Sequence, residues 1–187
     1  MLIEDGAGSG YKAKVGTDNR LKTVAITASA EHHVNHADGE AYVAVFASNP
    51  AGAGDVLFYL KNNGDTDMVI EGVTWQTSAA EEVYYKIDDS GTPGGTSDTL
   101  VPANLNAGSG NVADATCLGT IADGAVDITG LSGGRIVESL YLTSATSEHF
   151  NLEQDLIIPK NKTFTIYCVG GDTLLRGTVY FNFHGSL

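Results

Sequence analysis

The sequence has 187 residues, of which 42% are hydrophobic and 18% charged, so it is long enough for one domain with a sizeable core. Its 23 acidic and 10 basic residues give a net charge of -13, which disfavours nucleic-acid binding because an acidic surface repels phosphate. The longest apolar runs, such as Val56 to Leu60, cover only a few residues, so we expect no membrane-spanning helix and no membrane partner.

The first 22 residues differ in charge from the remainder of the chain. Residues 1–22 hold four basic and three acidic side chains, whereas residues 23–187 hold six basic and 20 acidic ones, so the two net charges are +1 and -14. The segment is also rich in glycine, which permits an irregular path. We therefore predict an extended N-terminal arm over residues 1–22. Its contact residues, with the acidic surface of another protein or of another subunit, are predicted to be Tyr11, Lys12, Lys14, Arg20 and Lys22.

Residues 23–187 alternate between apolar and polar side chains in short segments bounded by turn-forming residues, a pattern typical of strands. Strands are predicted at Thr23–Thr27, Ala41–Ala47, Asp55–Asn62, Met68–Gln76, Glu82–Ile87, Gly134–Thr143, Asp155–Pro159, Phe164–Val169 and Arg176–His184. The best helical candidate, Ser144–Asp155, is weakly periodic, so no amphipathic helix is expected. The pattern predicts an all-β fold: an antiparallel β-sandwich of the jelly-roll type.

Two hairpins are expected within this sandwich. Asn63-Gly64 has the composition of a tight turn with positive φ angles, which would join the strands on either side of it. A second hairpin would close the sheet with the C-terminal strand. In that strand Val179, Phe181 and Phe183 would face one side, and its apolar character predicts a place at the centre of a sheet or at a subunit contact.

Residues 88–120 are mostly small and polar, and they predict a long excursion with short strands near Leu100–Leu105 and Thr116–Ile121. A connection of this length in a compact domain is usually functional or docked on a neighbour, and a floppy insertion is the alternative. The two cysteines, Cys117 and Cys168, are predicted to be buried thiols and not a disulfide. This composition indicates folding in a reducing, intracellular environment.

No segment carries a complete catalytic motif, so we predict a protein that is not an enzyme and that holds no cofactor. The glycine-rich stretch from Gly6 to Ala13 lacks the adjacent Gly-Lys-Ser/Thr of a phosphate-binding loop. The adjacent carboxylates Glu81–Glu82 and Asp88–Asp89 would point to opposite faces of a strand, which makes them poor acid-base partners.

Two other groups of residues invite a binding site. His32, His33 and His36 lie among carboxylates and could hold zinc or nickel, although a solvated turn is the simpler interpretation. Trp75, with Tyr84 or Tyr85, could form the aromatic platform of a carbohydrate-binding module. A single tryptophan in a strand is more often part of the core.

The opening "IEDGAGSGYKAKVGTDNRLKTVAIT" resembles the start of virion structural proteins of tailed bacteriophages. Three later stretches are similar to segments of the same proteins: "VLFYLKNNGDTDMVIEGV", "VPANLNAGSGNVADAT" and "LIIPKNKTFTIYCVGGD". Together these stretches cover about half of the chain, and none of them is a catalytic signature.

The resemblance implies a structural protein made in the host cytoplasm and located in the virion, on the capsid surface. It is most like a capsid cement, or decoration, protein, which binds and stabilises the lattice of the major capsid protein, often as a homotrimer. The resemblance leaves a head-fibre base or a tail or baseplate adaptor as the alternative within the same class.

Overall fold

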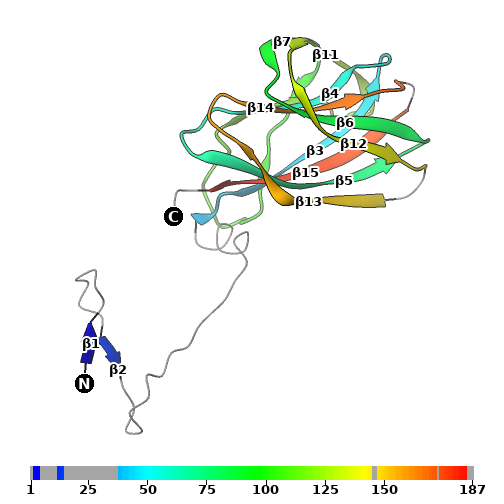
Figure 1. The fold of residues 1–187 in the computed structure, drawn as a ribbon. Coiled ribbons are helices and arrows are strands. Elements are labelled where there is room, and N and C mark those ends of the chain that lie inside the picture. The colour runs from blue at the N-terminus through cyan, green and yellow to red at the C-terminus, as the bar shows by residue number, and fades with distance from the viewer. Residues whose placement is uncertain (1, 5–11, 15–37, 145–146, 172, 185–187) are drawn as a thin grey trace.

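The computed structural model describes residues 2–4, 12–14, 38–144, 147–171 and 173–184 (Figure 1). Every element within these ranges is a β-strand, which confirms the predicted all-β fold. The predicted strand Thr23–Thr27 lies outside the described residues. The other eight predicted strands are all present, seven of them with ends that shift by a few residues. The eighth, predicted at Asp155–Pro159, is part of a longer strand over Ser147–Ile158 that also takes up most of the segment considered as a helix.

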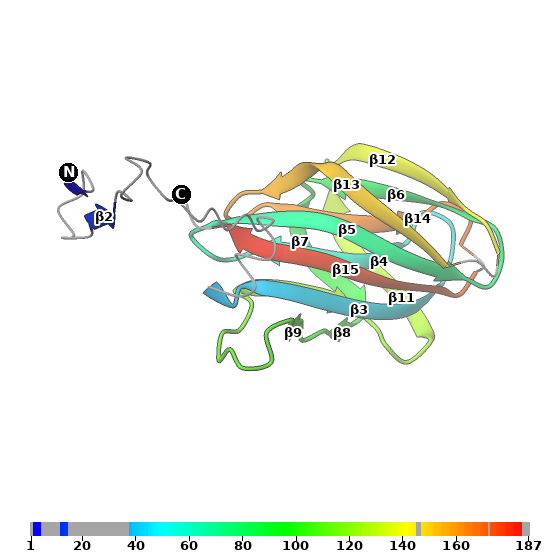
Figure 2. The same ribbon diagram turned by 90° about the horizontal axis from the view of Figure 1, so that it is seen from below.

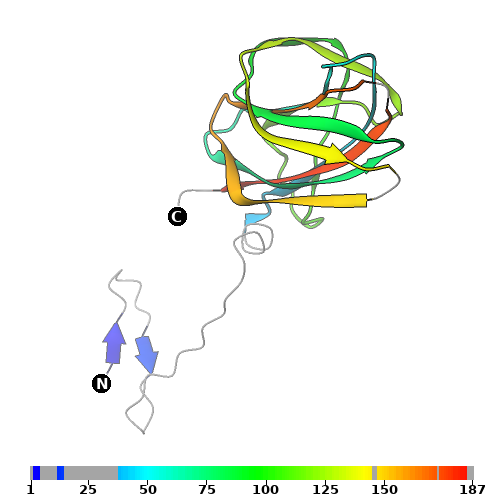
Figure 3. The same cartoon turned by 45° about the vertical axis from the view of Figure 1, so that its right-hand side comes forward.

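The strands form two sheets that pack face to face as a sandwich (Figures 1 and 3). The six-stranded sheet has, in order, β12 (Arg135–Leu142), β6 (Glu81–Ile87), β14 (Thr163–Cys168), β4 (Val56–Asn62), β10 (Ala115–Gly119) and β8 (Asp98–Thr99). The second sheet has, in order, β13 (Ser147–Ile158), β5 (Asp67–Thr77), β15 (Leu175–His184), β3 (Ala41–Pro50), β11 (Gly124–Ser132) and β7 (Ser90–Thr96), and β9 (Ala103–Asn104) also pairs with β3. The pairing of β11 with β3 is parallel, and the other described pairings are antiparallel. The sandwich is confirmed, and its jelly-roll connectivity stays a prediction.

Aromatic side chains fill the space between the sheets. Phe46 lies against Trp75 and Phe58, with ring centroids 5.4 and 5.2 Å apart. The Trp75 indole stacks on Tyr85 from the opposite sheet and donates a hydrogen bond of 2.6 Å from Nε1 to its hydroxyl oxygen. Side chains of this size each bury a large apolar area, so they hold the two sheets together.

The predicted hairpin at Asn63-Gly64 is wrong, because β4 and β5 belong to different sheets. Neither Asn63 nor Gly64 has a positive φ angle. The Asn62 side chain organises this connection instead: its Oδ1 accepts from Gly64 N at 2.9 Å, and its Nδ2 donates to the Thr66 and Ile158 carbonyls. A turn-forming composition predicts that the chain reverses, but it does not say which sheet the next strand joins.

The predicted C-terminal hairpin fails for the same reason, since β14 and β15 lie in different sheets. The predicted central position of the last strand is correct, because β15 lies between β5 and β3 (Figure 3). Val179, Phe181 and Phe183 are all buried in the core. An irregularity between Tyr180 and Phe181 shifts the pairing with β5 at this point.

The region predicted as a polar excursion contains four strands, β7 to β10, of which β7 was not expected. The following strand β11 was not expected either, and it pairs with β7 to form a ribbon. Ile128 and Leu131 on this ribbon pack with Val56, Tyr59 and Tyr167 on the outer face of the six-stranded sheet. That face is therefore covered locally by a third layer.

Glycine permits the close pairing within this ribbon. Gly91 and Gly95 have φ angles of 111° and 80°, and a Cβ atom on either would lie 2.1 Å from a carbonyl oxygen of β11. No other residue type adopts this backbone at so small a separation without strain. The need for glycine at these positions explains why β7 can be a strand with almost no apolar side chains.

The described part of the N-terminal segment forms its own small sheet. β1 (Leu2–Glu4) and β2 (Lys12–Lys14) pair antiparallel, with Ile3 opposite Ala13. This two-stranded sheet is separate from both sheets of the sandwich.

Candidate interaction surface

Three shallow depressions lie side by side on the outer face of the seven-stranded sheet, and we call them together the outer trough. The first has a volume of 510 Å³ and is lined by Val43, Val45, Asp98, Thr99, Leu100, Val101, Ala103 and Ile121. It shares Val45 with the second, of 230 Å³, and the second shares Gln76 and Arg176 with the third, of 260 Å³. The outer trough thus extends from the excursion across β3, β15 and β5.

Strand register explains why these side chains meet. Val45 pairs with Thr178 on β15, which in turn pairs with Thr74 on β5, so the three residues form one row across the sheet. The next row holds Arg176 and Gln76, two positions further along each strand. Because side chains two residues apart point to the same face, both rows project outward from the core.

The end of the outer trough near the excursion is apolar. Val45, Val101 and Ile121 surround the first depression and are 53%, 83% and 66% exposed. Three large apolar side chains exposed around one concavity are typical of a protein-binding surface. The nearest charge in the lining is the carboxylate of Asp98, whose Oδ2 accepts a hydrogen bond of 2.9 Å from Thr120.

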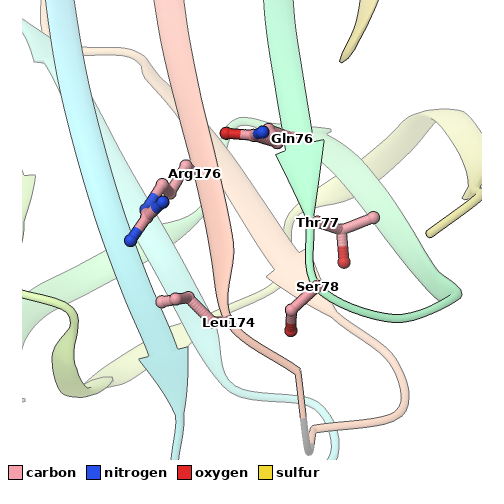
Figure 4. Close-up of a pocket in the computed structure, with 5 residues that line it drawn as sticks. All are labelled: Gln76, Thr77, Ser78, Leu174 and Arg176. Carbon is pink, nitrogen blue, oxygen red and sulfur yellow. The ribbon is translucent and has the colours of Figure 1, made fainter. Parts of the chain in front are cut away.

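The opposite end is polar and is shown in Figure 4, where Arg176 and Gln76 lie above Ser78 and Leu174. Arg176 makes an ion pair with Asp123 through two hydrogen bonds. Its Nε donates to Oδ1 at 3.2 Å, and its Nη2 donates to Oδ2 at 2.7 Å. The hydrogen bond from Arg176 lowers the pKa of the Asp123 carboxyl. The pair fixes the loop before β11 against β15, and it leaves the guanidinium half-exposed.

The carboxylate pairs considered for acid-base chemistry have structural roles. Glu81 is buried and accepts hydrogen bonds from Gly170 N at 2.7 Å and Gly171 N at 3.2 Å, while Glu82 is only half-buried. Asp89 is buried and accepts from Gly134 N at 3.0 Å, while Asp88 is exposed and pairs with Lys162 at 2.6 Å. Glu81 and Glu82 lie on β6 and differ in exposure, as the prediction of opposite faces requires. Asp88 and Asp89 lie in the connection between β6 and β7, so their difference in exposure does not come from opposite faces of a strand.

The predicted aromatic platform does not exist on the surface. Trp75 is 1% exposed and Tyr85 is 0% exposed, and the two side chains are bonded to each other inside the core. A sugar ring therefore has no access to the Trp75 face. Burial is also the reason that the pKa of Tyr85 is raised.

Both cysteines are buried free thiols, as predicted. Burial raises the pKa of Cys117, and it raises the pKa of Cys168 to about 12. In the described part of the chain, no three His, Cys, Asp or Glu residues are grouped so that they could hold a metal ion. The predicted His32, His33 and His36 cluster lies outside that part. Within the same ranges, no helix is long and apolar enough to cross a membrane.

The predicted arm contacts are only partly described. Lys12 and Lys14 lie on β2, whereas Tyr11, Arg20 and Lys22 lie outside the described residues. Their contact role stays a prediction. The outer trough was not predicted, although one signal for it was available: the segment "AYVAVFA" is apolar at both odd and even positions, which predicts contact on both faces of the strand.

Comparison of the chain with protein-family models, with curated proteins and with solved structures found no match. Inferences about function therefore rest on the chemistry and shape of the surface and on the resemblance of the sequence segments.

Proposed function

We propose that this chain is a non-enzymatic structural protein of a tailed-bacteriophage virion, and that it decorates the capsid by binding the lattice of the major capsid protein. The observation that carries the proposal is the exposed apolar end of the outer trough, formed by Val45, Val101 and Ile121. A broad, shallow concavity of this kind fits the surface of another protein better than it fits a small substrate. In this proposal the protein acts as a homotrimer on the outside of the capsid, after folding in the host cytoplasm.

The charge of the chain supports a protein partner and not a nucleic acid. A net charge of -13 repels the packaged genome, and it also keeps the free protein soluble until it binds. The apolar end of the trough supplies the attraction, and the Arg176–Asp123 pair at the polar end gives a directional contact at its rim.

Binding to bare capsids tests the proposal directly. Capsids assembled from the major capsid protein of the same genome are mixed with the full chain, and bound copies are counted by sedimentation and by electron cryomicroscopy. We expect hundreds of copies spread over the capsid surface. A few copies at one vertex would indicate a head-fibre base or a tail adaptor instead, and no binding at all would refute both.

Substitutions in the outer trough sharpen the test. Val101→Asp with Ile121→Asp should weaken capsid binding by about 30-fold, the equivalent of roughly 2 kcal/mol for a central interface contact. Ile157→Asp is the matched control, since Ile157 is 51% exposed on β13, away from the trough. Equal loss in both variants would contradict the assignment of the trough. Deleting residues 2–20 tests the arm, and unchanged occupancy would show that the arm is not needed for capsid binding.

A further inference from the structure

The end strand of the six-stranded sheet, β12, offers an open edge for another strand. It is the last strand in the order of its sheet, and among the described strands it pairs only with β6. Figure 2 shows β12 and β13 along one side of the sandwich, with β8 and β9 along the opposite side. Its segment Arg135–Leu142 contains no proline or lysine, two residues that block edge-to-edge pairing, and its irregularity between Ile136 and Glu138 leaves Glu138–Leu142 in regular register.

Hydrogen bonds show which backbone groups of β12 are open. Tyr141 is opposite Glu82 on β6, but the Glu82 carbonyl accepts from Val169 N on the far side. In an antiparallel ladder, Tyr141 and Ser139 therefore direct their own N–H and C=O groups away from β6. Ser139 N donates only a long bond of 3.3 Å, to the Glu138 side chain. These groups are available to an added strand.

Beyond Arg135, which begins the strand, the only charged side chain of β12 is the carboxylate of Glu138, and most of the others are apolar. Ile136 and Tyr141 are 53% and 69% exposed, which is unusual for large side chains on an edge strand. The Glu138 and Glu82 carboxylates both lie against Ser139, Glu82 at 2.9 Å from its hydroxyl oxygen. From Glu138 to Leu142 the strand carries no basic residue, so it favours a partner strand with positive charge.

The N-terminal strands of the same chain have the chemistry that this edge requires. β2 carries Lys12 and Lys14, two of the ten basic residues of the protein. β1 and β2 form a sheet of two strands with three residues each, which is too small to be stable alone in water. Addition to the edge of a larger sheet would supply the missing pairing.

We propose that the β1–β2 hairpin of one copy adds to the β12 edge of a second copy. The proposal deepens the proposed function, because it rests on the contact role of the N-terminal arm and names the strand that receives it. The contact is head to tail between identical chains, so repeating it generates a ring, such as a trimer, when the rotation between copies closes, and an open filament when it does not. Main-chain hydrogen bonds then hold the added strand, and Lys12 and Lys14 bring positive charge to the edge that carries Glu138 and Glu82.

Cysteine cross-linking between single variants tests the proposal. Chains with Ala13→Cys are mixed with chains with Tyr141→Cys under mild oxidation, and products are separated without reductant. The native Cys117 and Cys168 are 1% and 0% exposed, so they do not compete. We expect a cross-linked pair that contains one chain of each kind. Ala13→Cys mixed with Val101→Cys is the control, since Val101 lies on the opposite side of the sandwich and should give little product.

Each alternative occupant gives a distinct result that would overturn the proposal. Tyr141→Cys chains that cross-link mainly with each other would show that β12 pairs with β12 of a second copy. If a chain that carries both substitutions forms an internal disulfide at high dilution, then β12 binds the N-terminal strands of its own chain. Equal or greater cross-linking to Val101, or no cross-linking at either position, would also refute it.

Charge reversal tests the electrostatic part. Glu138→Lys should slow cross-linking by about three- to fivefold, as expected for one exposed charge pair. Asp114→Lys changes the net charge equally on an exposed excursion residue, and it should leave the rate unchanged. Capsid occupancy is measured on the same variants. Normal occupancy without cross-linking would refute the inference alone, whereas cross-linking without capsid binding would refute the proposed function alone.

Discussion

Replacing Tyr85 by Phe isolates the hydrogen bond between Trp75 and Tyr85, which joins the two sheets inside the core. The substitution keeps the ring, which stacks on Trp75 at 6.3 Å and meets Phe164 edge-on at 5.6 Å. It removes only the hydroxyl oxygen that accepts the 2.6 Å bond from Trp75 Nε1. Both residues are fully buried, so water cannot replace the acceptor. Leaving a buried N–H group without a partner costs about 1 to 3 kcal/mol, and the free energy of unfolding should fall by that amount.

Urea unfolding followed by tryptophan fluorescence measures this effect, because Trp75 is the only tryptophan in the chain. We expect a lower midpoint with an unchanged slope, the sign of lost stability without a change in exposed surface. Tyr84→Phe is the matched control: it removes the same hydroxyl from the next residue of β6, which is half-buried on the other face. A loss below about 0.5 kcal/mol for Tyr85→Phe, or equal losses for both variants, would refute the role of this bond.

Two further predictions follow from single contacts. Gly177→Ala should cost about 1 to 3 kcal/mol by overpacking, since its Cβ would lie 2.4 Å from the Phe46 ring, whereas Gly124→Ala, with its nearest neighbour at 3.8 Å, should change the urea midpoint little. Asp123→Asn should lower the melting temperature at pH 7 but not in strong acid. Because Arg176 holds the native pKa of Asp123 below 3.8, the pair stabilises the fold above the unfolded-state pKa and loses this effect as pH falls through the lower native pKa. A difference between Asp123→Asn and the parent protein that persists in strong acid would contradict this account.

Strands with alternating apolar residues could be predicted from the sequence. Strands held mainly by backbone hydrogen bonds, with few apolar side chains, could not. β3, β4 and β15 each place large apolar side chains at every second position or more, so their burial pattern is already visible in the chain. β7, with the sequence "SGTPGGT", has no such side chains and pairs through glycines at close range. β11 was missed although Val126 and Ile128 alternate, because the flanking glycines resemble those of a loop.

The sequence did not predict which of the two sheets each strand joins, and this has a physical cause. The connections after Asn62 and after Cys168 have ordinary turn compositions, yet each carries the chain from one sheet to the other. The outcome depends on which face of each strand is buried against distant residues, and that is set by packing and not by the turn. The outer trough depends on the same non-local pairing, since its rows join β3, β15 and β5. Val45 could be predicted as a strand residue but not as part of the outer trough.

The central place of β15 has a consequence for how the protein is made. β3 and β5, its two neighbours in the sheet, end at Pro50 and Thr77, so both leave the ribosome about a hundred residues or more before β15 begins at Leu175. Until then, a gap separates β3 from β5, and two inner edges of the larger sheet are open to wrong pairing. The larger sheet can therefore be completed only after β15 has been synthesised. A chain cut short before Leu175 should aggregate in the cell even though nearly all of its core residues are present.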